Sequence, residues 1–169
     1  ASDYQLNIAN KFKRVPYEAA KQMSDFSSWG LSVDGDLKPD VTLPGGMIYS
    51  SVNNGEYYMD RGTSMASPHA AGATALVKQS LKERFPYLTP EQLQILVKQM
   101  TMSTAVPHVD EETKAYSSVR QQGAGVMDVT AAALGDLYVT AKGDKSSLTL
   151  GNVKDTFEFD VQGHNLSDH

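Results

Sequence analysis

The clearest pattern of hydrophobic and polar positions in this chain lies over residues 63–85, where Ala, Leu, Val and Lys dominate. These residues favour helix, so the stretch predicts one long helix that Pro86 ends. The first turns are apolar on nearly every side, whereas the later turns are amphipathic. A helix of this kind is expected to be buried at its N-terminal end.

A second helix is predicted to follow directly, beginning after residue 89. Thr89 suits the N-cap, Pro90 the first helical position and Glu91 the acidic first turn. The positions that follow make one apolar stripe at helical spacing, formed by Leu93, Leu96, Val97 and Met100. The stripe predicts a helix that packs along one face.

The chain before residue 63 has no comparable periodicity. Residues 1–25 mix short apolar stretches with basic residues, which we interpret as one short strand and a connector. Glycine and proline then recur as far as residue 54, a density that predicts loops with brief strands between them. The expected strands lie at residues 47–52 and 57–59.

The C-terminal third begins with a helix pattern and continues as strands. Asp128 is expected to cap a short helix over residues 129–134, and Gly135 to close it at a domain boundary. Further on, apolar residues at 157, 159 and 161 alternate with acidic ones at 158 and 160. This alternation predicts the opening of an antiparallel β unit.

Composition narrows the function without naming it. Of the 169 residues, 40% are hydrophobic, and 15 Lys and Arg against 20 Asp and Glu give a formal net charge of -5. That balance argues against a nucleic-acid partner, which requires a basic face. The chain contains no cysteine, so disulfides, thiolate zinc sites and cysteine nucleophiles are excluded. No apolar run is long enough to span a membrane, and no signal peptide is visible at the N-terminus.

Ser64 is the candidate for chemistry, because it stands where the flexible segment ends and the long helix begins. Two interpretations compete: a helix cap, or a nucleophile. A serine hydroxyl is a weak nucleophile, but the unpaired N–H groups of a helix N-terminus donate toward developing negative charge. Gly62 permits a sharp turn there, and Pro68 is expected near the first turn, where its missing N–H costs little.

The segment GTSMASPHAAG, residues 62–72, resembles the nucleophile segment of the subtilisin-like serine proteases. Similar motifs occur in the family's order: FSSWG at 26–30, LKPDVTLPGG at 37–46 with the following IYS, and GAGVMDVTAA at 123–132. The resemblance implies that Ser64 is a catalytic nucleophile that forms an acyl-enzyme. It also implies an α/β fold, the C-terminal part of a three-layer domain with a parallel sheet and a buried central helix.

Longer stretches resemble the large cell-envelope proteinases of streptococci and lactic-acid bacteria, which include lactocepin-like enzymes and virulence-associated peptidases that cleave complement or chemokine proteins. These stretches are FSSWGLSVDGDLKPD, ETKAYSSVRQQGAG and LTLGNVKDTFEF. The resemblance implies a connector leaving a protease-associated insertion (1–22), the catalytic segment (23–135) and the first strands of a fibronectin-type β-sandwich (136–169). It implies a secreted protein of the cell wall or surface of a Gram-positive bacterium.

Two residues depart from the family pattern near Ser64. Arg61 stands where a small residue usually precedes the GTS motif, and Leu43 replaces the usual alanine before Pro44. A large cation beside the nucleophile is expected to narrow a subsite or to bias the preference for substrate charge.

The family's catalytic Asp and His lie upstream of the serine, and no histidine precedes His69. We interpret His69 as structural, and His108, His164 and His169 as solvated surface residues. Asp40 is expected to satisfy backbone donors at a framework position. The chain alone is therefore expected to be inactive, and its partner to be an upstream segment or chain that carries Asp, His and the oxyanion Asn.

No cofactor is required on this interpretation. Subtilases commonly bind calcium, but the short acidic loops at residues 34–36 and 110–112 lack EF-hand spacing and are read as solvated charge. The function expected is endopeptidase cleavage of a protein substrate. The alternative is a non-catalytic scaffold or binding fragment of a surface protein.

Overall fold

The computed structural model of the chain describes residues 22–148, 150 and 153–167. The predicted connector over residues 1–22 therefore lies, except for its last residue, outside the described part. No helix in the described residues combines the length and apolar character needed to cross a membrane.

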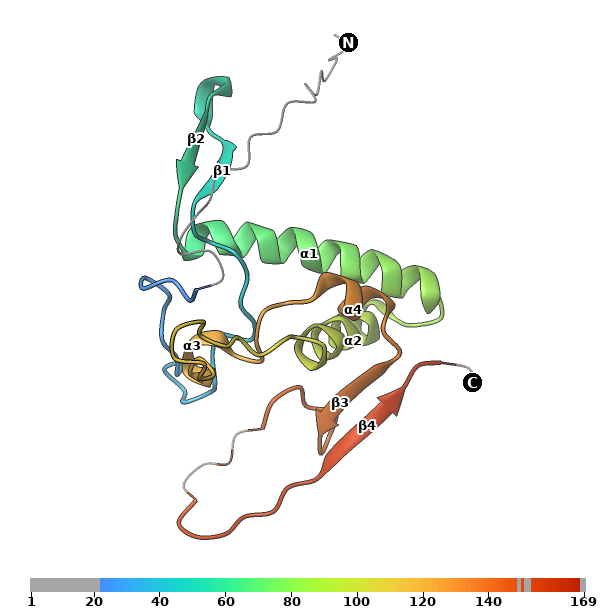
Figure 1. The fold of residues 1–169 in the computed structure, drawn as a ribbon. Helices are drawn as coiled ribbons and strands as arrows, with labels where there is room; N and C mark the ends of the chain where they lie inside the picture. The colour runs from blue at the N-terminus through green and yellow to red at the C-terminus, as the bar shows by residue number, and fades with distance from the viewer. Residues whose placement is uncertain (1–21, 149, 151–152, 168–169) are drawn as a thin grey trace.

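Two helices form the centre of the fold, as the periodicity predicts. α1 runs over Thr63–Arg84 and α2 over Pro90–Ser103, and α4 (Val129–Leu134) packs against both (Figure 1). Their apolar faces make one core with the residues around them: Ala73, Val77, Leu81, Phe85, Leu93, Leu96, Val97, Met100, Met127 and Ala132. The predicted apolar stripe of α2 is thus confirmed as its buried face.

The start of α2 follows the predicted capping chemistry closely. The Thr89 hydroxyl accepts a hydrogen bond from the Gln92 backbone N–H at 3.2 Å. The Gln92 side-chain carbonyl in turn accepts from the Thr89 N–H at 2.9 Å. This reciprocal pair is a capping box, in which two N–H groups that lack helical partners are satisfied at once.

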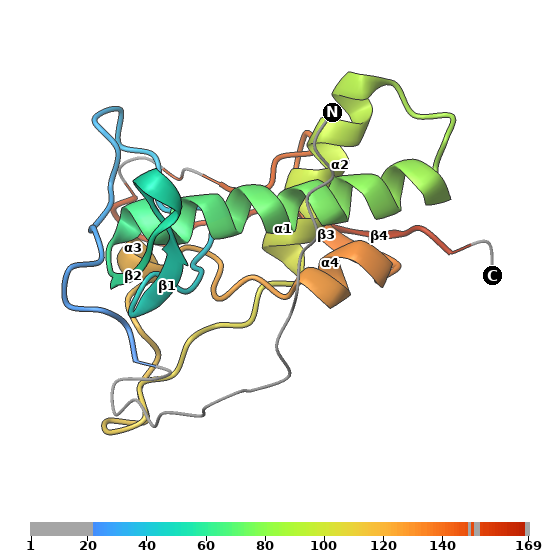
Figure 2. The ribbon, with the colours of Figure 1, turned by 90° about the horizontal axis from the view of Figure 1, so that it is seen from above.

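The predicted burial of the N-terminal end of α1 is wrong for the part of the chain that the structure describes. Pro68, His69, Ala71 and Gly72 are exposed, and the buried residues of α1 begin at Ala73. Seen from above in Figure 2, most of α1 lies uncovered across the molecule. The apolar surface is present, but none of the described elements packs over it.

A short hairpin precedes α1 and projects from its N-terminal end (Figure 1). Strands β1 (Ile48–Ser51) and β2 (Tyr57–Asp60) pair antiparallel, with Ile48 opposite Asp60. The turn between them is η1 (Asn53–Gly55). The two predicted strands are thus confirmed to within one or two residues.

The expected parallel sheet is not found among the described residues. Parallel pairing there is limited to the single bridge between Thr42 and Val126, and both sheets are two-stranded and antiparallel. A parallel sheet needs crossover connections between its strands. The described segments instead supply two antiparallel pairs and the short helix α3 (Val119–Gln122).

The C-terminal β unit consists of β3 (Leu137–Ala141) and β4 (Val161–Asn165), which pair antiparallel. The strand predicted from the alternation at 157–161 begins only at its last residue. Phe157 and Phe159 are exposed and stack on each other at 6.1 Å. Alternation alone did not make a strand there, because no described strand pairs with residues 157–160.

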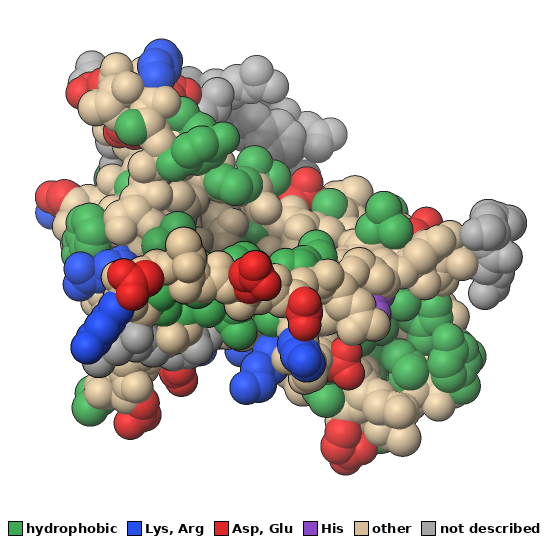
Figure 3. All heavy atoms as spheres, turned by 90° about the horizontal axis from the view of Figure 1, so that it is seen from below, with side chains coloured by type: hydrophobic (Ala, Val, Ile, Leu, Met, Phe, Trp, Pro, Cys, Tyr) green, Lys and Arg blue, Asp and Glu red, His purple; other side chains and the backbone are tan. Residues whose placement is uncertain are grey.

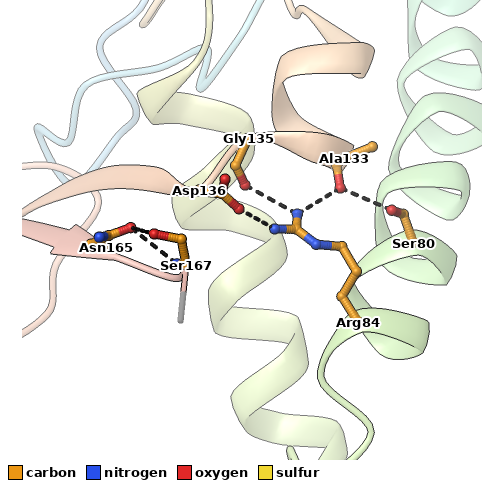
Figure 4. Close-up of polar contacts among 7 residues, drawn as sticks. All are labelled: Ser80, Arg84, Ala133, Gly135, Asp136, Asn165 and Ser167. Carbon is orange, nitrogen blue, oxygen red and sulfur yellow. Dashed lines mark hydrogen bonds and ion pairs between the residues drawn. The ribbon is translucent and has the colours of Figure 1, made fainter. Parts of the chain in front are cut away.

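Polar contacts join α1 to the segment that leads into β3 (Figure 4). The Arg84 guanidinium donates to the carbonyls of Ala133 and Gly135, at 3.0 and 3.1 Å, and pairs with the Asp136 carboxylate. Gly135 does end α4 as predicted, but with φ of -66° rather than a left-handed conformation. A Cβ at Gly135 would lie 2.5 Å from the Ala131 carbonyl oxygen, so close approach explains the glycine.

Two further contacts hold β3 against α2. The Ser103 hydroxyl donates to the Val139 carbonyl at 3.1 Å and accepts from the Val139 N–H at 3.0 Å. The buried Gln99 side chain donates to the Asp144 carbonyl at 3.0 Å. β3 and the turn that follows it are therefore bonded to α2, across the predicted boundary at residue 135.

Candidate active site

Ser64 lies in the first turn of α1, as its second residue, and is exposed. The N-cap is Gly62, whose φ of 150° favours glycine, and no side chain caps this helix. The cap interpretation of Ser64 is therefore excluded by its position.

The N-terminus of α1 presents unpaired donors beside this hydroxyl. The Met65 and Ala66 N–H groups donate to the Gly62 carbonyl at 3.0 and 3.3 Å. Among the described residues, no group accepts a hydrogen bond from the N–H of Thr63 or Ser64. These two N–H groups are available to an anion or an oxyanion, because the helix itself offers them no acceptor.

The turn that presents Ser64 is held by the loop before the hairpin. The Gly62 N–H donates to the Gly45 carbonyl at 2.8 Å. A Cβ at Gly45 would lie 2.6 Å from the Gly62 carbonyl oxygen and 3.1 Å from the Ala66 Cβ. Only glycine at position 45 lets the loop approach this closely. The sequence shows Gly45 as part of a family motif, but no local pattern predicts this contact.

His69 fixes the same loop from the second turn of the helix. Its Nδ1 lies 2.8 Å from the Pro44 carbonyl oxygen, so Nδ1 carries the proton and donates. Leu43, the neighbouring departure from the family pattern, is partly buried and packs against the core. Both residues position the loop, which agrees with a structural role for His69.

Pro68 lies in the second turn, not near the start of the helix as expected. At this position it lacks the N–H that would donate to the carbonyl four residues earlier, which is that of Ser64. The Ser64 carbonyl therefore lacks this helical hydrogen bond, and the helix is weakened at the serine and not at its N-cap.

Arg61 stands beside the turn with its guanidinium over the Phe26 ring, 5.9 Å from the ring centroid. An open cavity of about 380 Å³ lies here, lined by Asp25, Phe26, Arg61, Gly62 and Thr63. The FSS motif gave a signal for Phe26 in the sequence, but not for its contact with the arginine. The departure at position 61 therefore lines a cavity beside the turn that carries Ser64.

A larger cavity of about 720 Å³ adjoins the same turn. Its lining includes Trp29, Leu31, Leu43, Thr63 and Ala66. The Trp29 and Leu31 side chains are 58% and 54% exposed, so this hollow is open and largely apolar.

Two further histidines lie apart from Ser64 in the chain, and His108 and His164 are not the solvated groups expected. His108 is partly buried, with Nδ1 2.7 Å from the Ser117 hydroxyl. His164 stacks on Tyr138 at 4.4 Å and bonds the Thr140 hydroxyl at 2.8 Å. His169 lies outside the described residues.

The acidic candidates are engaged in local contacts. The Asp40 carboxylate pairs with Lys38 at 2.8 Å and Lys98 at 3.6 Å, in place of the backbone donors expected. Asp110 accepts hydrogen bonds from the Thr113 N–H and hydroxyl, both at 2.7 Å, which lower its pKa. Within the described residues no cluster of three or more His, Asp or Glu side chains could hold a metal ion.

Comparison with known proteins adds to this geometry. A family model described as the subtilase family matches residues 15–125. The chain is 45% identical over 157 residues to a C5a peptidase of Streptococcus pyogenes serotype M6, covering 92% of this chain. It is 42% identical over 140 residues to a PII-type proteinase of Lactococcus lactis subsp. cremoris, covering 77% of this chain.

The chain spans 13% of the length of the first of these relatives and 7% of the second. Among solved structures, the patellamide maturation protease PatA matches with a TM-score of 0.41 and 28% identity. The match covers 53% of this chain and 30% of that one.

Proposed function

Since the chain belongs to the subtilase family, we propose that it is the serine-bearing part of a subtilisin-like endopeptidase with Ser64 as its nucleophile. The observation that carries the proposal is the exposed hydroxyl of Ser64 beside the unpaired N–H groups of an uncapped helix. The relatives are named peptidase and proteinase, which supports peptide-bond hydrolysis as the reaction.

The reaction begins with attack of the Ser64 Oγ on the carbonyl carbon of the scissile bond. A histidine supplied upstream takes the hydroxyl proton and passes it to the leaving amine, and a carboxylate orients that histidine. The Ser64 N–H donates to the oxyanion, and the upstream Asn provides a second donor. Water then hydrolyses the acyl-enzyme on Ser64 with the same histidine as base.

The chain needs a partner for this reaction. The His69 Nδ1–H donates to the Pro44 carbonyl, which supports a catalytic base that comes from outside this chain. In subtilisin, loss of the catalytic histidine alone lowers kcat by about 10⁶-fold. The chain alone is therefore inactive on this proposal, with Asp, His and Asn on an upstream segment or a separate chain.

The open apolar surface that runs from the cavity beside the Ser64 turn along α1 is the proposed place for that partner. It comprises the 720 Å³ cavity with Trp29 and Leu31 and the uncovered face of α1 with Leu76, which is 61% exposed. Apolar surface of this kind is normally covered in a soluble protein. The upstream part of the same catalytic domain is the occupant that the length of the relatives supports.

The wider setting follows from the relatives. Because they come from Streptococcus and Lactococcus, which are Gram-positive, we place the protein in the secreted or cell-surface fraction, at the cell wall. The catalytic segment ends near residue 135, and the β3–β4 pair opens a fibronectin-type β-sandwich. The antiparallel pairing of these strands is what supports this assignment.

The alternative is a scaffold fragment that binds proteins without catalysis. The exposed Phe157, Phe159 and Val161 of the β unit are the residues that favour it. A scaffold needs no reactive serine, so reactivity at Ser64 separates the two functions.

The test is labelling by a serine-directed organophosphorus probe in the full polypeptide that contains this chain. The endopeptidase proposal expects labelling that is lost in Ser64→Ala, while Ser67→Ala, a matched change on the same helix, retains it. Absence of labelling in a folded full polypeptide would favour the scaffold.

A further inference from the structure

Arg61 lies within reach of any peptide bound at Ser64. It precedes the serine by three residues, and each residue spans at most about 3.6 Å, so the two Cα atoms lie within about 11 Å. An extended peptide covers that distance in about three residues. A substrate side chain that meets Arg61 therefore belongs to a residue close to the scissile bond.

The Arg61 guanidinium is held in place by an aromatic side chain. It lies over the Phe26 ring at 5.9 Å from the centroid, within the distance at which a cation and a ring attract. The guanidinium carries its N–H donors in a planar fork that matches a carboxylate. The contact with Phe26 thus restricts the Arg61 side chain before a peptide binds, so less side-chain entropy is lost on binding.

The charge of Arg61 has no ion-pair partner among the described residues. The nearest acid in the chain, Asp60, is bonded elsewhere. Its Oδ1 accepts the Arg61 backbone N–H at 2.8 Å, and its Oδ2 accepts the Tyr58 hydroxyl at 3.1 Å. That hydrogen bond raises the pKa of Tyr58 and keeps the tyrosine protonated as a donor.

The cavity beside Arg61 adjoins the turn that carries Ser64. Its lining residues Phe26, Gly62 and Thr63 also line the larger cavity, so the two hollows share a wall next to Ser64. At about 380 Å³ it has room for one side chain of a bound peptide. Asp25 also lines this cavity, and its negative charge opposes the preference for acidic side chains that Arg61 creates.

We infer that Arg61 is a specificity-determining residue that selects peptides with an Asp or Glu side chain within about three residues of the scissile bond. The inference rests on the proposed function, because it concerns the substrate of the same serine. An ion pair at an exposed site contributes modestly, and the expected preference for Glu over Gln is about fivefold in kcat/KM. Salt screening should reduce the preference, since the pair is open to solvent.

The experiment uses the full polypeptide and internally quenched peptides. A randomised peptide library, read by mass spectrometry, first gives a cleaved sequence. Peptides that differ only by Glu, Gln or Lys at each position flanking the cleaved bond then give kcat/KM ratios at low and high salt. The variants are Arg61→Ser, Arg61→Lys, Asp25→Asn and Lys82→Ser, the last as a distant cation on α1.

The expected result is a Glu preference at one flanking position that Arg61→Ser abolishes and Arg61→Lys partly retains. Asp25→Asn should strengthen it, and Lys82→Ser should leave it unchanged. Cleavage with equal rates for Glu and Gln, or a preference that survives Arg61→Ser, overturns the inference while the protease function stands. A Lys preference lost in Asp25→Asn overturns it in favour of Asp25. No cleavage and no labelling of Ser64 would overturn both.

Discussion

The position of the serine depends on a contact between two backbone segments at a single glycine. Gly45 lies against the Gly62 carbonyl and Ala66, at distances that leave no room for a Cβ. His69 fixes the neighbouring Pro44 carbonyl from the helix side. The first turn of α1 therefore keeps its shape only if the loop at position 45 is glycine.

Gly45→Ala is expected to destabilise the chain by about 1–3 kcal/mol, the usual cost of forcing extra volume into a packed site. In the full polypeptide it should also lower the rate of Ser64 labelling, because the turn must shift. Gly72→Ala is the matched control, since a Cβ there meets nothing within 4 Å, and alanine should stabilise α1 by about 0.5–1 kcal/mol. Urea unfolding of the variants would measure both effects, and equal stabilities of the two would contradict the assignment.

Asp110 is expected to titrate below the ordinary aspartate pKa of 3.8, because the Thr113 N–H and hydroxyl donate to its ionised form. A lowered pKa in the folded state gives stability that is present above pH 3.8 and lost as pH falls through the folded pKa. Thr113→Val removes one donor and should move the pKa of Asp110 back toward 3.8. NMR titration of the carboxyl carbon measures the shift, and an unchanged pKa in the variant would refute its cause.

At the scale of elements, Arg84 joins the end of α1 to the entry of β3 (Figure 4). It donates to two carbonyls at the C-terminal end of α4, where helical carbonyls lack their own partners. It also pairs with Asp136, one residue before β3. Arg84 thus ties α1 to the start of the β unit, in addition to the contacts that Ser103 and Gln99 make from α2.

Arg84→Met should destabilise the folded chain by about 1–3 kcal/mol, because the Gly135 carbonyl loses the donor that satisfies it. Lys82→Met on the same turn of α1 is exposed and should change stability little. Hydrogen exchange of the β3 amides should also become faster in Arg84→Met. Unchanged exchange and stability would show that the Arg84 contacts do not hold the junction.

The elements that sequence analysis placed correctly are those with local causes. Thr89 and Asp128 cap α2 and α4 by bonding the residue three positions further along, so the local sequence is enough to predict both caps. The errors concern features that depend on partners far along the chain. The alternation at 157–161 needs a strand to pair with, and the burial of the first turns of α1 needs a layer to cover them.

The candidate site divides in the same way. The motif around Ser64 and its place at a helix start can be predicted from the sequence, because both depend on a few consecutive residues. The role of Gly45 and the contact between Arg61 and Phe26 were not, since each joins segments 17 and 35 positions apart in the numbering. Only the fold brings these segments together.

At the scale of the molecule, apolar side chains remain open on the surface of the described chain. Figure 3 shows hydrophobic patches on one face between acidic and basic side chains. Trp29, Leu31 and Leu76 are each more than half exposed. Leu76 lies on α1, the helix that carries Ser64, and Trp29 and Leu31 line the cavity beside the first turn of that helix, so apolar surface is open near the serine as well.

The chain alone is therefore expected to bind an environment-sensitive apolar dye and to self-associate at high concentration. Addition of the upstream segment should reduce the dye signal by covering this surface. Leu76→Gln should lower the dye signal of the isolated chain and weaken association with the segment. A dye signal unaffected by the segment, with association shown by sedimentation, would mean that the apolar surface is not the interface.

The measurement that tests the central claim most directly is probe labelling of this chain alone, of the chain mixed with its upstream segment, and of the Ser64→Ala mixture. We predict labelling in the wild-type mixture only, because the upstream histidine must activate the Ser64 hydroxyl. Labelling of the wild-type chain alone would contradict the need for that histidine. Labelling that persists in Ser64→Ala, or none in a mixture whose chains associate, would contradict the assignment of Ser64 as the nucleophile.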